Sequence, residues 1–305
     1  MMKLVLFLNM GGACNLKDCE LFLKNMFNDP YILGIKNAFL RSFVAFCITK
    51  ARVGAMRENY KQIGGSSPLN FITTSLCDKL NSRQKDFQFD FVNLYVPPFA
   101  KEVLQKYDLK NDDELILFPL YPHHSSTTIT TSLEVLHKEI KKQEIKTKLK
   151  EVEFFYKDKL YNEMLISHIL RANESFMPGY KKSLIFSAHS LPLSVIKKGD
   201  LYEKHINVHF ELLKESLKDY FDEILLAYQS KLGPVKWLGP STSEILSTLK
   251  NEALIYPLSF CIDCVETIFE LEIEYRKIAS KDYKVIACPN ESEEFMEFIL
   301  KRLYS

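Results

Sequence analysis

The stretch SLIFS at residues 183–187, followed by AHSLP at residues 188–192, is the clearest guide to the fold of this chain. A short, nearly continuous apolar run is typical of a strand that is buried on both faces, because a half-exposed strand alternates apolar with polar residues. The segment that follows it, ending in Pro192, predicts a loop at the carboxyl end of the strand. His189 lies in that loop.

The same pattern recurs along the chain, with amphipathic segments between the apolar runs. Strands are predicted at residues 3–9, 88–94, 114–118, 151–156, 183–187, 222–227, 252–256 and 283–286. Helices are predicted at residues 35–61, 69–83, 128–143, 159–175, 201–219, 264–280 and 291–303, where apolar residues recur at three-to-four spacing. This alternation predicts an α/β protein whose parallel sheets are covered on both faces.

Composition excludes several classes of protein. The 305 residues correspond to about two domains. The 47% of hydrophobic and 26% of charged residues exclude long disorder. Forty basic residues against 39 acidic ones give a net charge of +1, which is too balanced for a protein that binds nucleic acid along its surface. Seven scattered cysteines favour a reducing compartment, and we expect a cytoplasmic protein.

Membrane signals are weak. The apolar run at residues 4–8 is shorter than an export signal and ends at Asn9, so a buried first strand is favoured. No other uncharged apolar stretch approaches the roughly 18 residues that span a bilayer, which predicts a soluble or at most peripheral membrane protein.

The five lysines at residues 141–150 predict a solvated helix end and a hinge near the crossover between two halves.

Ligands of open parallel sheets bind beyond the carboxyl ends of strands, which directs attention to the loops at residues 9–13, 119–128, 187–202 and 228–242. Gly11 and Gly12 permit close approach by a ligand, but the third glycine of the dinucleotide fingerprint is absent. Gly64 and Gly65 lack the Lys-Ser/Thr pair of a phosphate loop and predict a turn between two helices. We therefore expect neither NAD nor FAD.

The loop at residues 119–128 is dense in hydroxyl and imidazole groups. Its serines and threonines, Ser125 among them, are typical of helix caps. His123 and His124 are adjacent and point in different directions, so at most one of them faces a cleft. Solvent exposure and metal binding both remain open for this pair, and we expect a supporting role such as metal loading.

A single imidazole and a set of carboxylates are the strongest chemical candidates. His189 at the end of a strand can accept a proton near neutral pH or bind a divalent metal. Four acidic residues at spacings of three, four and four predict one stripe along a helix: Asp263, Glu266, Glu270 and Glu274. Such a stripe is either a solvated face or, because its helix begins soon after a strand, part of the site. Partial burial would couple Glu266 and Glu270 and raise the pKa of at least one of them, because like charges disfavour double ionisation.

Cys261 and Cys264 form half of a zinc or iron-sulfur motif, since two cysteines lie three residues apart. The remaining cysteines form no second close pair at ligand spacing. We therefore predict buried apolar cysteines and neither zinc nor a cluster.

Taken together, these segments resemble ferrochelatases, which insert ferrous iron into a porphyrin in haem synthesis, and the resemblance covers nearly the whole chain. The landmarks follow the family order. They are LNMGG at residues 8–12, YKQIGGSSPL at 60–69, YP at 121–122 with SSTT at 125–128, FSAHSLP at 186–192, YQSKLGP at 228–234 with WLGP at 237–240, and DCVETIFELE at 263–272.

The resemblance implies two similar doubly wound, Rossmann-like domains with parallel sheets enclosing a porphyrin cleft. The halves would be residues 1–148 and 149–290, with the C-terminal helix at 291–305 packing back on the first half. The implied activity is insertion of Fe²⁺ into protoporphyrin IX with release of two protons, by a monomer. A coproporphyrin III ferrochelatase and a non-catalytic porphyrin- or haem-binding protein remain alternatives.

The resemblance also assigns residues. His189, Glu266 and Glu270 match the catalytic positions, of which His189 and Glu266 would hold the metal, and Asp263 matches an outer acidic path. Four residues match positions lining or supporting the porphyrin cleft: Met10, Tyr60, Ser125 and Trp237. Arg41, Arg52 and Arg57 are the candidates to meet the propionates.

The chain departs from the family pattern at two places. His123 and His124 stand where many members have Gln and an aromatic residue, and Cys264 stands where many have His. The cysteine-rich extension that carries an iron-sulfur cluster in some relatives is missing, so we expect no cofactor beyond the substrate Fe²⁺.

The chemistry of the implied reaction is consistent with these residues. Exchanging two pyrrole protons for Fe²⁺ requires a base, a metal site weak enough to release iron, and a rigid clamp on the macrocycle. One imidazole with carboxylates supplies the first two. The 22 Phe and 15 Tyr residues can supply apolar walls for a flat substrate.

Overall fold

The computed structural model describes residues 1–174 and 182–304. The chain forms two compact units. Unit 1 comprises Met1–Tyr121 and Ser125–Glu153, and unit 2 comprises Pro122–His124 and Phe154–Ser305. In the described part of the chain, none of the helices is both long and apolar enough to cross a membrane.

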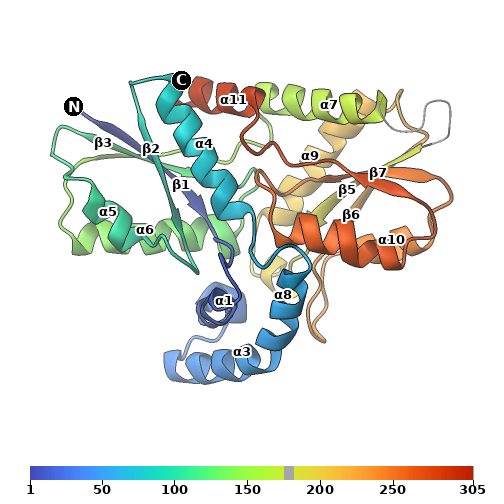
Figure 1. The fold of residues 1–305 in the computed structure, drawn as a ribbon, viewed down its shortest axis with the longest axis horizontal. Helices are drawn as coiled ribbons and strands as arrows, with labels where there is room; N and C mark the ends of the chain where they lie inside the picture. The colour runs from blue at the N-terminus through green and yellow to red at the C-terminus, as the bar shows by residue number, and fades with distance from the viewer. Residues whose placement is uncertain (175–181, 305) are drawn as a thin grey trace. The chain divides into compact units, whose positions relative to one another are not determined.

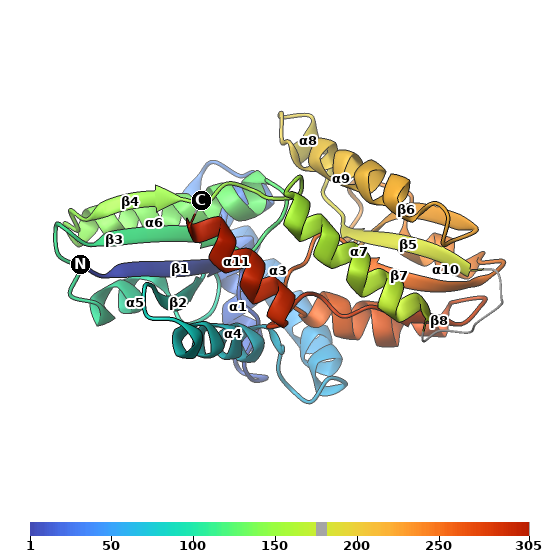
Figure 2. The same cartoon turned by 90° about the horizontal axis from the view of Figure 1, so that it is seen from above.

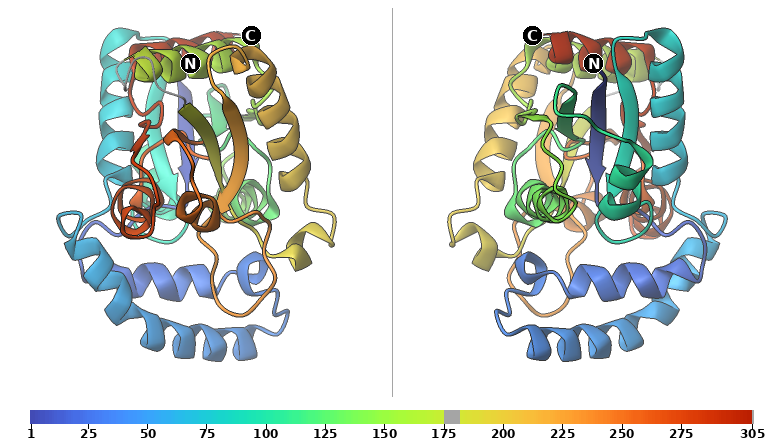
Figure 3. Two further views of the ribbon diagram at one scale, coloured as in Figure 1. Left: turned by 90° about the vertical axis from the view of Figure 1, so that its right-hand side faces the viewer. Right: turned by 90° about the vertical axis from the view of Figure 1, so that its left-hand side faces the viewer.

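Unit 1 is built on a parallel sheet in the order β2-β1-β3-β4. Its strands are β1 (Lys3–Asn9), β2 (Gln88–Asn93), β3 (Glu114–Pro119) and β4 (Lys148–Glu151). Because successive side chains point to opposite faces, Leu6 packs toward α5 (Ala100–Lys106) and α6 (Thr131–Lys142), while Phe7 stacks on Phe89 on the other face. Figure 3 shows the strands between α6 and α4 (Leu69–Arg83).

Three further helices of unit 1 precede the crossover to β2. They are α1 (Asp18–Phe27), α2 (Pro30–Leu33) and the long α3 (Ala38–Lys61). The helices α1 and α3 pack on each other beyond the carboxyl end of β1, where Figure 1 shows them apart from the sheet. The sequence pattern predicted α3 and α4 but missed α1, α2 and α5, which are short.

Unit 2 repeats the strand order of unit 1 with β6-β5-β7-β8. Its strands are β5 (Lys182–His189), β6 (Glu223–Gln229), β7 (Glu252–Pro257) and β8 (Tyr283–Val285). The helices α7 (Lys159–Glu174) and α9 (Tyr202–Leu217) cover one face, where the rings of Phe186 and Phe210 meet. The other face is covered by α10 (Thr242–Ser247), η2 (Glu266–Glu274) and η3 (Tyr275–Lys277). Two parallel four-stranded sheets with flanking helices confirm the predicted α/β class.

The C-terminal helix α11 (Glu293–Tyr304) packs on α7 within unit 2. The ring of Phe298 lies 5.3 Å from the ring of Tyr161, and Arg171 donates to Glu294 at 2.8 Å. Figure 2 shows the two helices adjacent to each other. The predicted return of this helix to the first half, and the predicted domain boundaries, stay predictions.

The strand predicted at residues 151–156 is wrong. The fourth strand of unit 1 is β4 at Lys148–Glu151, inside the lysine-rich stretch that was assigned to a helix end and hinge. It lies at the edge of the sheet and is largely exposed, and lysines are common on such edges because they discourage pairing with another chain. The apolar residues after it, including Phe155, are buried outside any strand.

Candidate active site

His189 is the last residue of β5, which lies between β6 and β7. It pairs in register with Gln229, the last residue of β6, while Ser187 pairs with Pro257 at the end of β7. Three strand ends therefore lie side by side at one edge of the sheet. Ser259, which follows β7, accepts a hydrogen bond from the backbone N–H of His189.

The hydrogen bonds of His189 determine which of its nitrogen atoms is free to react. Its Nδ1 lies 2.7 Å from the backbone carbonyl oxygen of Ser190. A carbonyl oxygen only accepts, so Nδ1 carries the proton and Nε2 of the neutral ring keeps its lone pair. A histidine that donates one N–H to a carbonyl in this way presents its other nitrogen as a base or metal ligand.

Glu266 begins η2, a π-helix that ends at Glu274. The helix predicted at residues 264–280 is thus present in shorter form, and Glu266–Glu274 within it have the rarer π geometry, which is often found at functional sites. The Nε2 atom of Gln229 donates to the backbone carbonyl of Glu266 at 3.0 Å, which connects the start of η2 to the end of β6. Burial, followed by the negative charge of nearby Glu266, raises the pKa of the Cys264 thiol.

Glu270 is anchored at the end of β6 by four hydrogen bonds. The backbone N–H of Ser230 donates to Oε1 at 2.7 Å, and Nε2 of Gln229 donates to Oε2 at 3.2 Å. The Ser230 hydroxyl also donates to Oε2, and the Tyr275 hydroxyl donates to Oε1. Burial and the nearby Glu270 carboxylate raise the pKa of Tyr275. Glu270 therefore has a fixed orientation.

The two ends of the acidic stripe differ from its middle. Asp263 precedes η2 rather than lying on it, which corrects the predicted helical stripe. Its carboxylate accepts hydrogen bonds from Thr267 and Asn290, so it ties two loops together, and its place on an outer acidic path stays a prediction. Glu274 is exposed, and partial burial followed by repulsion from Glu270 raises its pKa. The raised pKa expected for Glu266 or Glu270 stays a prediction.

The cysteines near η2 are buried, as predicted. Cys261, Cys264 and Cys288 are free thiols, and burial raises the pKa of each. Burial of this kind favours the neutral thiol over the thiolate that binds metals. In residues 1–174 and 182–304, no group of three or more His, Cys, Asp or Glu side chains is arranged to hold a metal ion.

Trp237 lies in the loop after β6. It forms an isolated bridge with Pro192 in the loop after β5, and its Nε1 donates to the carbonyl of Leu232 at 3.0 Å. The backbone N–H of Leu193 donates to the carbonyl of Lys236. The loops that carry His189 and Trp237 are therefore paired.

In unit 1, Met10 follows β1 and is half-buried. The two glycines after it are needed for close packing within unit 1, and the approach of a ligand to them stays a prediction. A Cβ on Gly11 would lie 2.6 Å from Val96, and a Cβ on Gly12 would lie 2.4 Å from Ser67. The segment that bears Met10 is thus held against two neighbouring loops.

Tyr60 and Ser125 are both buried, with 1% of their surfaces exposed. Ser125 is the N-cap of the π-helix η1 (Ser126–Thr130), where its hydroxyl accepts from the backbone N–H of Thr127 at 3.2 Å. This confirms the capping role predicted for the hydroxyl-rich loop. Gly64 and Gly65 form the predicted turn between α3 and α4, and both have positive φ angles.

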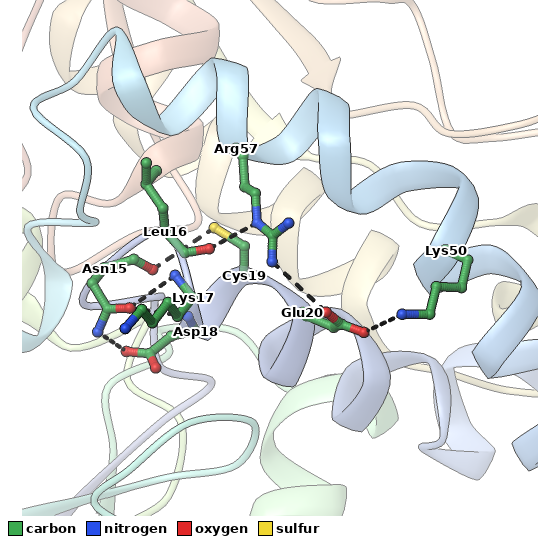
Figure 4. A network of polar contacts seen from close by, with 8 residues as sticks. All are labelled: Asn15, Leu16, Lys17, Asp18, Cys19, Glu20, Lys50 and Arg57. Carbon is green, nitrogen blue, oxygen red and sulfur yellow. Dashed lines mark hydrogen bonds and ion pairs between the residues drawn. The ribbon is translucent and has the colours of Figure 1, made fainter.

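The three candidate arginines of α3 differ in the hydrogen bonds and ion pairs that they form. Figure 4 shows Arg57 donating to the carbonyl of Leu16 at 3.0 Å, while Lys50 and Arg57 flank Glu20 of α1. Arg41 donates to the carbonyls of Asn28 and Ile35. Arg52 is half-buried, burial lowers its pKa, and among the described residues its guanidinium has no hydrogen bond or ion pair. Arg52 is thus the arginine that is available to a ligand.

His123 belongs to unit 2 and is 2% exposed, so the solvent-exposed alternative is wrong for it. The amide nitrogen of Asn162 donates to two backbone carbonyls, which turns its Oδ1 toward Nε2 of His209 at 2.9 Å. Nε2 of His209 must donate there, so its Nδ1 accepts from Nε2 of His123 at 2.8 Å. His123 is a neutral, buried ring whose Nδ1 has no partner in the described part of the chain.

The sequence patterns did not indicate which residues form hydrogen bonds with His123, His124 and His189. His205 accepts from the backbone N–H of His124 at 3.2 Å, and burial lowers the pKa of His205 to about 4 and that of His209 to about 3. Tyr202, His205 and His209 recur at i, i+3 and i+7 on α9, so helical spacing could have grouped them. Ser259 follows β7, a strand end that was not among the four chosen loops.

Solved structures share the fold of this chain. SirB from Bacillus subtilis with Fe³⁺ aligns with a TM-score of 0.56 at 10% identity, over 100% of this chain and 95% of that chain. CbiX, described as the terminal enzyme of siroheme biosynthesis in denitrifying bacteria, aligns with a TM-score of 0.54 at 12% identity, over 100% and 98%. At these identities the alignments show a shared fold alone.

Sequence comparison identifies the family. The ferrochelatase family profile matches residues 3–304. Curated ferrochelatases are 70% identical in Campylobacter jejuni (strain RM1221), covering 99% of both chains, and 54% identical in Campylobacter concisus (strain 13826), covering 99% of this chain and 97% of that one. A ferrochelatase from a Nitratiruptor species is 45% identical, covering 98% of both.

The chain belongs to the ferrochelatase family, the iron chelatases of haem synthesis. This confirms the family, the enzyme class and the place in porphyrin metabolism that the sequence landmarks implied.

Proposed function

We propose that this enzyme inserts Fe²⁺ into protoporphyrin IX with release of two protons. We propose further that His189 Nε2 is the first group to accept a pyrrole proton or to bind the metal. The observation that supports this most is the hydrogen bond from His189 Nδ1 to Ser190, which leaves Nε2 unprotonated in a neutral ring. A neutral imidazole can accept a pyrrole proton or bind Fe²⁺ weakly enough to release it.

Glu266 and Glu270 would complete the exchange. Glu266, at the start of η2, would be the second metal or proton acceptor, and Glu270 would receive protons at a fixed carboxylate held by Gln229 and Ser230. Two N–H bonds of the porphyrin break and both protons leave through these groups, while Fe²⁺ balances the charge of the resulting dianion and is bound by all four ring nitrogens. Met10, Tyr60, Ser125 and Trp237 would line or support the porphyrin site.

The direct test is steady-state turnover with Fe²⁺ under anaerobic conditions. We expect metalloporphyrin to form with protoporphyrin IX over many cycles. Tight porphyrin binding without turnover would instead favour a non-catalytic haem-handling protein. Faster turnover with coproporphyrin III than with protoporphyrin IX would make the four-propionate porphyrin the substrate.

We also propose that the enzyme needs no resident cofactor. The raised pKa values of Cys261, Cys264 and Cys288 favour thiols that do not bind iron. Anaerobically purified protein should lack visible cluster absorbance and stoichiometric acid-labile sulfide. Either signal, in proportion to protein, would overturn this proposal.

We propose a cytoplasmic monomer that contacts anionic membranes through α3. Phe39, Phe43 and Phe46 lie at helical spacing and are 86%, 61% and 56% exposed. Residues 30–57 contain five basic and no acidic residues, which suits an anionic lipid surface.

Phe43→Ser should reduce sedimentation with anionic vesicles. Phe71→Ser, which alters an exposed Phe of α4, should not. Equal binding by wild type and Phe43→Ser would exclude this face.

A further inference from the structure

Three residues from separate segments form a closed ring of hydrogen bonds behind the imidazole of His189. The backbone N–H of His189 donates to Oγ of Ser259 at 2.8 Å. The Tyr202 hydroxyl donates to the backbone carbonyl of His189 at 2.9 Å. Burial raises the pKa of Tyr202, and the Ser259 side chain lowers it, which is the effect of a hydrogen-bond donor to the phenol oxygen.

The direction of each bond follows from the groups involved. An amide N–H only donates and a carbonyl only accepts, so His189 fixes two of the three bonds. The Tyr202 proton is used on the carbonyl, which leaves its oxygen to accept from the Ser259 hydroxyl. Each hydroxyl therefore donates once and accepts once, so every donor of the ring has an acceptor. Burial raises the pKa of Tyr202, which keeps that phenol protonated.

The two side chains are themselves held in place. Tyr202 begins α9, its backbone N–H donates to Asp200 at 2.9 Å, and its buried ring meets the edge of His123 at 6.1 Å between centroids. Ser259 follows β7, where the backbone N–H of Leu258 donates to the carbonyl of Ser187 at 2.9 Å. Both hydroxyls thus approach His189 from rigid elements.

We propose that Ser259 and Tyr202 are positioning residues that fix the peptide of His189 and thereby the direction of its Nε2 lone pair. The proposal rests on the catalytic role proposed for His189. At the end of β5, rotation of this one residue would swing the imidazole without unfolding the sheet. A misplacement of about 1 Å can lower the rate of an enzyme around a hundredfold. Hydrogen bonds that hold both the N–H and the carbonyl of the His189 peptide should therefore preserve kcat.

The test compares Ser259→Ala, Tyr202→Phe and the double variant. We expect each single variant to lower kcat about tenfold while KM for porphyrin changes less than about twofold, because the porphyrin site is untouched. The double variant should be no slower than the slower single variant, since opening the ring once removes its function. Ser259→Thr, which keeps the hydroxyl, should recover most of kcat.

The matched control is Tyr256→Phe in β7. Tyr256 is fully buried, and its hydroxyl has no hydrogen-bond partner in the described residues, so its loss should leave kcat unchanged. Nitrogen-15 NMR of the His189 ring should report a changed tautomer population in Ser259→Ala and Tyr202→Phe but not in Tyr256→Phe.

The outcomes separate the two proposals. Wild-type kcat and unchanged His189 resonances in Ser259→Ala, with an inactive His189→Ala, would overturn the positioning role alone. A fully active His189→Ala would overturn the proposed function as well. Multiplying losses in the double variant would also contradict a ring that acts as a unit. If Tyr202→Phe fails to fold, Ser259→Ala decides, because it removes a single oxygen atom.

Discussion

The Nδ1 atom of His189 lies 2.7 Å from the carbonyl oxygen of its neighbour Ser190, so the reactive lone pair belongs to Nε2. His189→Ala should therefore abolish iron insertion while the fold and porphyrin binding persist, because the side chain is half-buried at a strand end. Loss of acid-base catalysis corresponds to about 10² to 10⁴ in rate. Turnover above about a tenth of wild type, measured beside porphyrin affinity by fluorescence quenching, would contradict this role.

Glu266→Gln should cripple turnover, because the amide matches the carboxyl in size but accepts no proton and binds iron weakly. Glu274→Gln is the matched control on the same helix. It should leave kcat near wild type, since Glu274 lies at the exposed end of η2. The raised pKa of Glu274 means that its charge is disfavoured in the folded state, so Gln should not lower thermal stability at neutral pH. Equal turnover of Glu266→Gln and wild type would remove Glu266 from the mechanism.

Arg52→Ala should raise KM for porphyrin with a smaller effect on kcat, because its guanidinium is unengaged in the described chain and can pair with a propionate. Arg41→Ala should instead lower the unfolding temperature, since Arg41 binds backbone carbonyls. Kinetics and thermal melts of both variants decide this. An unchanged KM in Arg52→Ala would exclude Arg52 from substrate binding.

Acid should destabilise this enzyme through its buried histidines. His205 and His209 have pKa values of about 4 and 3 in the folded chain, against about 6.5 when unfolded. Below pH 6.5 the unfolded chain binds more protons, so stability falls, by up to about 1.4 kcal/mol per pH unit for each histidine. The fall continues until the folded values are reached. Urea unfolding at pH 7, 6 and 5 should show a shallower pH slope for His209→Gln, and an equal slope would refute the assignment.

Much of the fold could be predicted from patterns that burial imposes. β1 and β5 are buried on both faces and gave continuous apolar runs, so their positions were predicted closely. β4 was misplaced because an edge strand carries Lys148 and Lys150, whose polarity follows exposure rather than strand geometry. The short helices α1 and α5 escaped because few residues define their periodicity.

The candidate residues could be chosen from the sequence, the residues that support them could not, and the catalytic roles stay predictions. His189 and Glu266 follow from residue type and strand ends. Ser259 and Gln229 act through the polar groups of other residues, and a sequence does not show which peptide a hydroxyl or amide will meet after folding. The burial of His123 depended likewise on Asn162 and His209, which are distant along the chain.

The distribution of thiols over the two units has a practical consequence. Cys14 and Cys47 are exposed and the other five cysteines are buried, and Cys47 adjoins Phe46 on α3. Exposed thiols react with maleimides far faster than buried ones. A Cys14→Ser chain would therefore carry a single native attachment point for a spin label or fluorophore on the helix that is proposed to meet lipid. The depth of α3 in the membrane could then be measured spectroscopically without introducing any new cysteine.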